Sequence, residues 1–251
     1  MSLLVAKILL MPVLLGTAVA AGQRWGDRAG GLILGLPLVS GPVSVLLFVE
    51  QGKRFALAAA HSALLGFVAG GVFCAIYAST SEKMPWYRAL VASLAALIAT
   101  AWVLEPLDLD WLRTALLVAA TLALLAKTVR TERAHQPQRT PRKREVASQI
   151  GVASLVVLAL TAGAGVLGSY LAGMMATVPV ISAVLATSSI RRNGAGAANE
   201  LLRSAVIGSW GGAAFFATVG VLLSVTNPLA TYATAAAAAL LGGTAGARLS
   251  S

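Results

Sequence analysis

Proline and serine recur together at two places in the chain, within stretches that are otherwise apolar. The first stretch, from residue 31 to 44, reads GLILGLPLVSGPVS and holds Pro37 and Pro42. A proline removes a helix hydrogen bond and disfavours the α conformation in the residue before it, so a helix here should bend or break. Carbonyl groups freed at membrane depth are tolerated only against protein or a polar cavity. The candidate solute-binding residues at this break are Pro37, Ser40, Gly41 and Ser44.

The second Pro-x-x-Ser stretch contains Pro179 and Ser182, which match Pro37 and Ser40 in the first stretch. Interrupted helices at corresponding places in two halves of a membrane protein are the best sequence indication of a transporter's binding site. The alternative is that these prolines only bend helices for packing. We interpret both stretches as parts of one substrate site.

Ionisable residues within the apolar runs are the next candidates for chemistry, because charge is costly in a bilayer and is usually kept for function. His61 titrates near neutral pH and could bind solute or carry a coupling proton; a neutral histidine bonded to a carbonyl is the alternative. When the two Pro-x-x-Ser stretches are aligned, the counterpart of His61 is Arg203, which shares a helix face with Glu200 and predicts a local ion pair. Glu50, at the end of an apolar run, is expected to anchor the chain at the interface or to contact solute.

Motifs for other chemistry are absent from the sequence. The chain has one cysteine, Cys74, and two histidines without partners at metal-ligand spacing. It also lacks the phosphate-binding, zinc-protease and serine-hydrolase motifs. We therefore expect no cofactor, no metal and no catalytic residues, and a protein that is not an enzyme.

The composition is that of a membrane protein. Apolar residues make up 58% of the chain and charged residues 11%, against roughly 25% charged in soluble domains. At about 20 residues for each crossing, the apolar runs predict about nine transmembrane helices. The fold class expected is an all-α polytopic membrane protein.

Basic residues explain the net charge of +10 and predict the orientation. They lie in short loops and in one hydrophilic stretch, 127–145, rather than on one face, which argues against nucleic-acid binding. Placing that stretch on the cytoplasmic side puts the N-terminus outside and the C-terminus inside. The expected location is a multi-pass protein of a bacterial-type inner membrane.

An internal repeat organises the spans. Aligning positions 26–75 with positions 168–217 without a gap gives 12 identities, including Gly26 with Gly168 and Gly52 with Gly194. Five spans separate equivalent elements, so the two units should be inverted. The domains expected are a first four-helix unit (1–105), a linking helix (106–128), a basic linker (129–145) and a second four-helix unit (146–251). The glycines expected to let helix backbones approach closely are Gly66, Gly70, Gly208 and Gly212.

These features lead to a functional hypothesis with one alternative. The first expectation is a secondary transporter or exporter of a small solute, with anionic solutes favoured, that works by alternating access between the inverted units. The alternative is a non-transporting membrane component, such as a lipid-handling enzyme or an assembly subunit, whose basic linker contacts a partner or anionic lipid. The expected partners are the lipid bilayer and a small-molecule solute; a homodimer or a second membrane subunit is left open.

Overall fold

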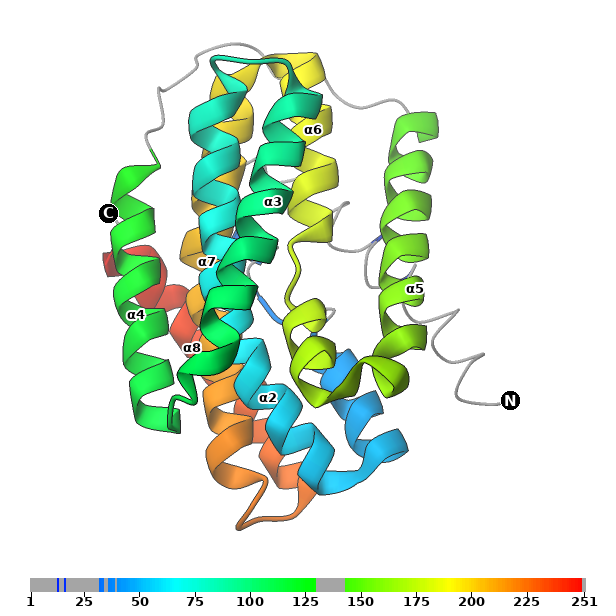
Figure 1. Ribbon diagram of the computed structural model, residues 1–251, viewed down its shortest axis with the longest axis vertical. Helices are drawn as coiled ribbons and strands as arrows, with labels where there is room; N and C mark the ends of the chain where they lie inside the picture. The colour runs from blue at the N-terminus through cyan, green and yellow to red at the C-terminus, as the bar shows by residue number, and fades with distance from the viewer. Residues whose placement is uncertain are drawn as a thin grey trace.

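The structure, a computed structural model, describes residues 40–129 and 143–249, together with residues 13, 16, 32, 33 and 36–38. The described part is 89% helical and contains no strand, which confirms the all-helical class. The first expected span (2–21) and most of the basic linker (130–142) lie outside the described residues. The elements, in chain order, are α2 (Ser40–Ser81), α3 (Trp86–Leu104), the 3-10 helix η1 (Glu105–Leu107), α4 (Trp111–Thr128), α5 (Lys143–Ala176), α6 (Val180–Asn193), α7 (Ala195–Leu222) and α8 (Pro228–Leu249) (Figure 1).

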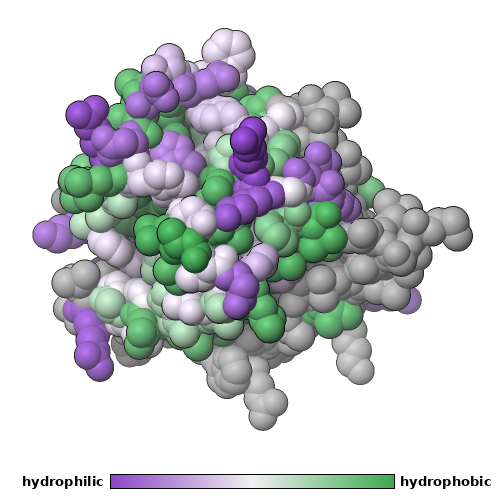
Figure 2. Space-filling view, turned by 90° about the horizontal axis from the view of Figure 1, so that it is seen from below, coloured by the Kyte–Doolittle hydropathy of each residue, from purple (hydrophilic) through white to green (hydrophobic). Residues whose placement is uncertain are grey.

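Four of the described helices are long and apolar enough to cross a membrane, judged by length and composition. They are Ser40–Ser81, Trp86–Leu107, Trp111–Thr128 and Ala195–Leu222. Seen from the end where α2 turns and α7 joins α8, hydrophilic side chains lie scattered among apolar ones (Figure 2). Several helices can therefore span a bilayer, as expected of a membrane protein.

The core lies between α2 and α7. In the apolar window of α2 78% of the residues are buried and in that of α7 56%, against 17% for Trp86–Leu107 and 22% for α4. Helices α3 and α4 instead turn large apolar side chains outward, such as Trp102 (75% exposed) and Leu112 (70% exposed). An apolar outer layer of this kind is what a helix in contact with lipid presents.

Three glycines divide the long helices. Gly52 within α2, Gly168 within α5 and Gly194 between α6 and α7 have φ of 82°, 77° and 85° with ψ of 177°, 171° and 175°. Only glycine adopts this conformation at low cost, because a Cβ atom would clash with the backbone. Each glycine therefore ends one helical run and lets the next begin at once in a new direction, as Figure 1 shows for the lower end of α5.

The helix interruptions expected at the two prolines are both present. α5 ends at Ala176 and α6 begins at Val180, with Pro179 outside helical geometry (φ −78°, ψ 54°). Residues 36–38 form bends and a turn before α2 begins at Ser40. Pro42 does not contribute to this interruption, because it lies in the first turn of α2, where its missing N–H group is not needed.

Candidate functional site: two helix breaks and a pocket

The break at Pro37 packs against α7 and α8. Ser40 and Ser44 are both buried. The hydroxyl group of Tyr232 in α8 donates to the carbonyl oxygen of Ser44 (3.1 Å) and lies 3.3 Å from its Oγ. A Cβ atom on Gly41 would lie 3.4 Å from the ring of Phe215 in α7. Two serine hydroxyls and a tyrosine hydroxyl thus gather at the start of α2.

Glycines of α7 make room for the chain that leads into this break. The carbonyl oxygen of Leu32 occupies the space that a Cβ atom on Gly208 would need. A Cβ atom on Gly211 would lie 2.6 Å from a methyl carbon of Leu36. Gly212, on the same helix, is buried. Helix α7 therefore has no room for larger side chains on the face that meets this segment.

The break at Pro179 packs against α2. A Cβ atom on Gly70 would lie 3.6 Å from the carbonyl oxygen of Thr177 and 3.7 Å from Cδ of Pro179. Gly66, one turn earlier, faces the side chain of Thr177. Ser182, which follows this break, is 5% exposed. The two breaks therefore lie against different members of the central helix pair.

His61 and Arg203 both contact α4. Nε2 of His61 lies 2.9 Å from Oγ1 of Thr114, and its ring packs edge-on against Trp111, with ring centres 4.8 Å apart. Nε of Arg203 donates to the carbonyl oxygen of Ala126 over 3.0 Å. His61 thus contacts the start of α4, and Arg203 contacts its end.

The two acidic candidates lie away from the breaks. Glu50 is exposed, just before the turn at Gly52, and Glu200 is partly buried in the second turn of α7. The ion pair expected between Glu200 and Arg203 stays a prediction. In the part of the chain that the structure describes, no group of three or more His, Cys, Asp or Glu residues could hold a metal ion.

The sequence analysis missed two polar contacts that join the ends of the central helices. Nδ2 of Asn199, which is 3% exposed, donates to Oε1 of Glu82 over 2.5 Å at the end of α2. Nζ of Lys53 donates to the carbonyl oxygen of Ser224 over 2.9 Å at the end of α7. Neither contact leaves a spacing signal, because the partners are far apart in the sequence.

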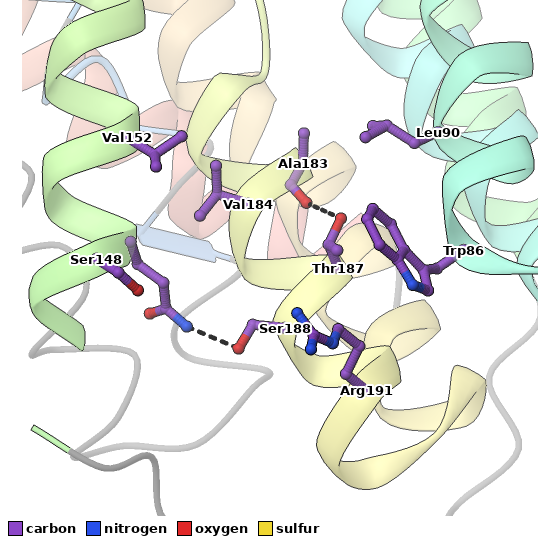
Figure 3. Close-up of a pocket in the computed structure, with 10 residues that line it drawn as sticks. Trp86, Leu90, Ser148, Val152, Ala183, Val184, Thr187, Ser188 and Arg191 are labelled. Carbon is purple, nitrogen blue, oxygen red and sulfur yellow. Dashed lines mark hydrogen bonds between the residues drawn. The ribbon is translucent and has the colours of Figure 1, made fainter. Parts of the chain in front are cut away.

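A pocket of about 290 Å³ lies over α6, between α3 and α5 (Figure 3). It is lined by Trp86, Leu90, Ser148, Gln149, Val152, Ala183, Val184, Thr187, Ser188 and Arg191. None of these residues is among the candidates that the sequence analysis names. The one sequence signal for them is the polar side chains that interrupt the apolar runs of α5 and α6.

In this pocket, a buried glutamine of α5 forms a hydrogen bond with a serine of α6. Nε2 of Gln149 donates to Oγ of Ser188 over 2.7 Å, while Oε1 of the same amide is buried and has no hydrogen-bond partner among the described residues. Buried polar groups are almost always bonded, and each exception asks for an explanation. The pocket thus has chemical features of its own, separate from the two breaks.

Comparisons of the chain with protein-family models, curated proteins and solved structures give no match. The arguments about function therefore depend on the geometry of the chain alone.

Proposed function

We propose that this protein is a secondary carrier of a bacterial-type inner membrane, with its N-terminus outside and its C-terminus inside. Two inverted four-helix units, residues 1–105 and 146–251, rock against each other about the linking helix α4. A small solute binds at the breaks near Pro37 and Pro179. A proton or sodium gradient drives its movement.

Backbone equivalence between positions that the repeat alignment pairs supports the duplication. Gly52 and Gly194 adopt nearly the same conformation, with φ of 82° and 85° and ψ of 177° and 175°. Trp86 and Pro228, which are paired when the alignment is extended, are the first residues of α3 and α8. Equivalent turns and equivalent helix starts are expected if one ancestral unit was duplicated.

The contacts of α4 support the inversion. His61 and Arg203 are paired by the same alignment, and they bind α4 at Thr114 and Ala126, near its opposite ends. If the units were related by a two-fold axis in the membrane plane, equivalent residues would meet opposite ends of a helix that crosses the axis. The two contacts of α4 therefore support the proposed axis.

The ends of the central helices support the same axis. Glu82 and Ser224 are equivalent positions that follow the last turns of α2 and α7. Each accepts a hydrogen bond from the helical run of the other helix that follows a turn glycine, Glu82 from Asn199 after Gly194 and Ser224 from Lys53 after Gly52. Two equivalent helices packed head to tail are the expected centre of an inverted repeat.

The observation that most directly supports a transport function is the pair of buried helix breaks. Each break packs against the central helix of the other unit. Interrupted helices free backbone groups for a solute at a depth where water is absent. Ser40, Ser44 and Ser182 add buried hydroxyl groups there. A movement between the units would change the surroundings of both breaks together, as alternating access requires.

Transport by the purified chain in proteoliposomes tests the proposal. A panel of small organic anions and neutral solutes would first be screened for thermal stabilisation, and the best binder then followed by counterflow under an imposed proton or sodium gradient. Ser40→Ala and His61→Ala should lower the rate of transport while the amount of folded protein stays unchanged. Ser79→Ala is the matched control, because Ser79 is exposed on α2 and bonds only its own helix, at the carbonyl oxygen of Ile76.

The possible results test the assignment of the solute site and the transport function separately. Wild-type transport in both Ser40→Ala and His61→Ala would remove these residues from the solute site. Absence of counterflow for every solute that stabilises the protein would argue against a carrier and favour a non-transporting membrane component.

A further inference from the structure

The pocket over α6 has a polar end and an apolar end. Arg191, Ser188 and Ser148 lie toward one end, and Leu90, Val152 and Val184 toward the other (Figure 3). The polar end coincides with the last turns of α6 and the first turns of α3 and α5. Helix ends lie at the membrane surface when helices span a bilayer, so the pocket changes from polar to apolar in the direction of the hydrocarbon.

Positive charge surrounds the polar end. The guanidinium group of Arg191 lies 6.0 Å from the ring centre of Trp86, within range of a cation–π interaction. Arg88 and Arg144 are exposed near the starts of α3 and α5, at the same end of the molecule. A tryptophan beside basic residues is typical of the level at which lipid head groups lie.

The apolar end reaches the outer surface of the molecule. Val152 is 53% exposed, and Leu155, one turn further along α5, is 70% exposed. Val91 on α3 is 65% exposed beside the pocket residue Leu90. A ligand that enters the pocket can therefore continue along apolar surface in contact with the bilayer, which favours a lipid over a water-soluble solute.

The side-chain oxygen of Gln149 can accept a hydrogen bond from a ligand. In the part of the chain that the structure describes, this Oε1 atom is a buried acceptor without a partner, next to the bond that Nε2 of the same residue makes to Ser188. A ligand hydroxyl near this amide would supply the missing donor. The cation at Arg191 in turn suits a phosphate group.

We propose that this pocket binds one anionic phospholipid whose head group carries hydroxyl groups, as phosphatidylglycerol does. The phosphate lies at Arg191, the head-group hydroxyls lie toward Gln149 and Ser188, and the first methylene groups lie against Leu90 and Val152. About 290 Å³ is at the lower end of the range of roughly 300 to 1,000 Å³ for ligand pockets. It has room for a head group, while the chains follow the outer surface of α3 and α5. This binding site goes beyond the proposed carrier function and does not depend on it.

Lipid retention by the full chain tests the site. The protein would be delipidated in detergent and titrated with phosphatidylglycerol or with phosphatidylcholine of the same chains, with bound lipid counted by native mass spectrometry. We expect one tightly held phosphatidylglycerol. Arg191→Gln should weaken its binding about fivefold, the effect of one basic residue near a lipid surface. Arg113→Gln makes the same charge change at the exposed start of α4, away from the pocket, and should leave the binding unchanged.

A second pair of variants changes the size of a side chain without changing any charge. Val152→Trp fills the apolar end of the pocket and should lower phosphatidylglycerol binding, whereas Leu155→Trp introduces the same side chain one turn away and should not. Equal losses in Arg191→Gln and Arg113→Gln, or equal retention of the two lipids, would overturn the proposal. Displacement of the lipid by millimolar glycerol 3-phosphate would also overturn it, because the site would then take a soluble phosphate.

Discussion

Single glycines give this chain its sharpest turns. Gly52, Gly168 and Gly194 each join two helical runs without a loop. Apart from nearby residues of the same helical runs, no atom of the described residues lies within 4 Å of where their Cβ atoms would be. Space is therefore available for a side chain at all three positions. The backbone conformation alone requires glycine there.

Replacing Gly194 by alanine should consequently destabilise the protein. The cost expected for a non-glycine residue in this backbone region is about 1 to 3 kcal/mol. Gly151→Ala is the matched control, because Gly151 also has open space around it but lies inside a helical run of α5. Unfolding in detergent, followed by circular dichroism, would compare the two. Equal stability of Gly194→Ala and Gly151→Ala would show that the turn at Gly194 is not strained.

The close approach of the backbone of Leu32 to Gly208 gives a second prediction for single residues. A Cβ atom on Gly208 would collide with the backbone of Leu32, whereas one on Gly70 would meet only ordinary contacts, the nearest at 3.6 Å. Gly208→Ala should lower the free energy of unfolding by about 1 to 3 kcal/mol through overpacking, and Gly70→Ala should change it by less than about 0.5 kcal/mol. The same unfolding assay applies. A larger loss in Gly70→Ala than in Gly208→Ala would contradict the packing described for the two breaks.

At the scale of elements, α4 differs from the central helices α2 and α7 because less of it is buried. Its buried residues, Thr114, Val118, Leu122 and Ala126, recur at every fourth position and form one narrow stripe. Leu117 and Leu125 pack beside this stripe, whereas Leu112, Leu116 and Leu124 are exposed, so α4 is attached to the core along one side. The bonds from His61 and Arg203 lie near those ends.

Removing the hydroxyl group of Thr114 should loosen this attachment. Thr114→Val keeps the shape of a fully buried side chain but leaves Nε2 of His61 without its partner. The expected loss of stability is about 1 to 3 kcal/mol. Thr128→Val is the control, because Thr128 is exposed and, among the described residues, its hydroxyl group bonds only to the carbonyl oxygen of Leu125 in its own helix. Equal unfolding free energies for the two variants would show that the His61 contact contributes nothing.

The sequence predicted the helices and their interruptions better than it predicted their contacts. Whether a proline interrupts a helix, and whether an apolar run is long enough to form one, both depend on residues that are close in the sequence. The breaks at Pro37 and Pro179 could therefore be located from residue spacing alone. Pro42 was expected to add to the first break, yet it lies in the first turn of α2 because a helix start tolerates proline. The bond between Gln149 and Ser188 and the bond between Asn199 and Glu82 depend on tertiary packing, which periodicity does not encode.

At the scale of the whole molecule, the proposed inverted repeat would relate most of these observations to one another. The turn at Gly52 and the turn at Gly194, the contacts of His61 and Arg203 with α4, and the contacts at Glu82 and Ser224 are each paired by the same alignment. An odd number of spans between equivalent residues would place them on opposite sides of the membrane. The proposed alternating access requires this inversion.

Cysteine accessibility at the two equivalent turns tests the inversion most directly. In a Cys74→Ala background, which has no other thiol, single cysteines would be placed by Gln51→Cys and Asn193→Cys, each immediately before its turn glycine. A membrane-impermeant maleimide applied to intact and to permeabilised cells then reports the side of each position. Labelling of Gln51→Cys in intact cells and of Asn193→Cys only after permeabilisation is the predicted result. Labelling of both positions from the same side would contradict the inverted repeat and the carrier mechanism built on it.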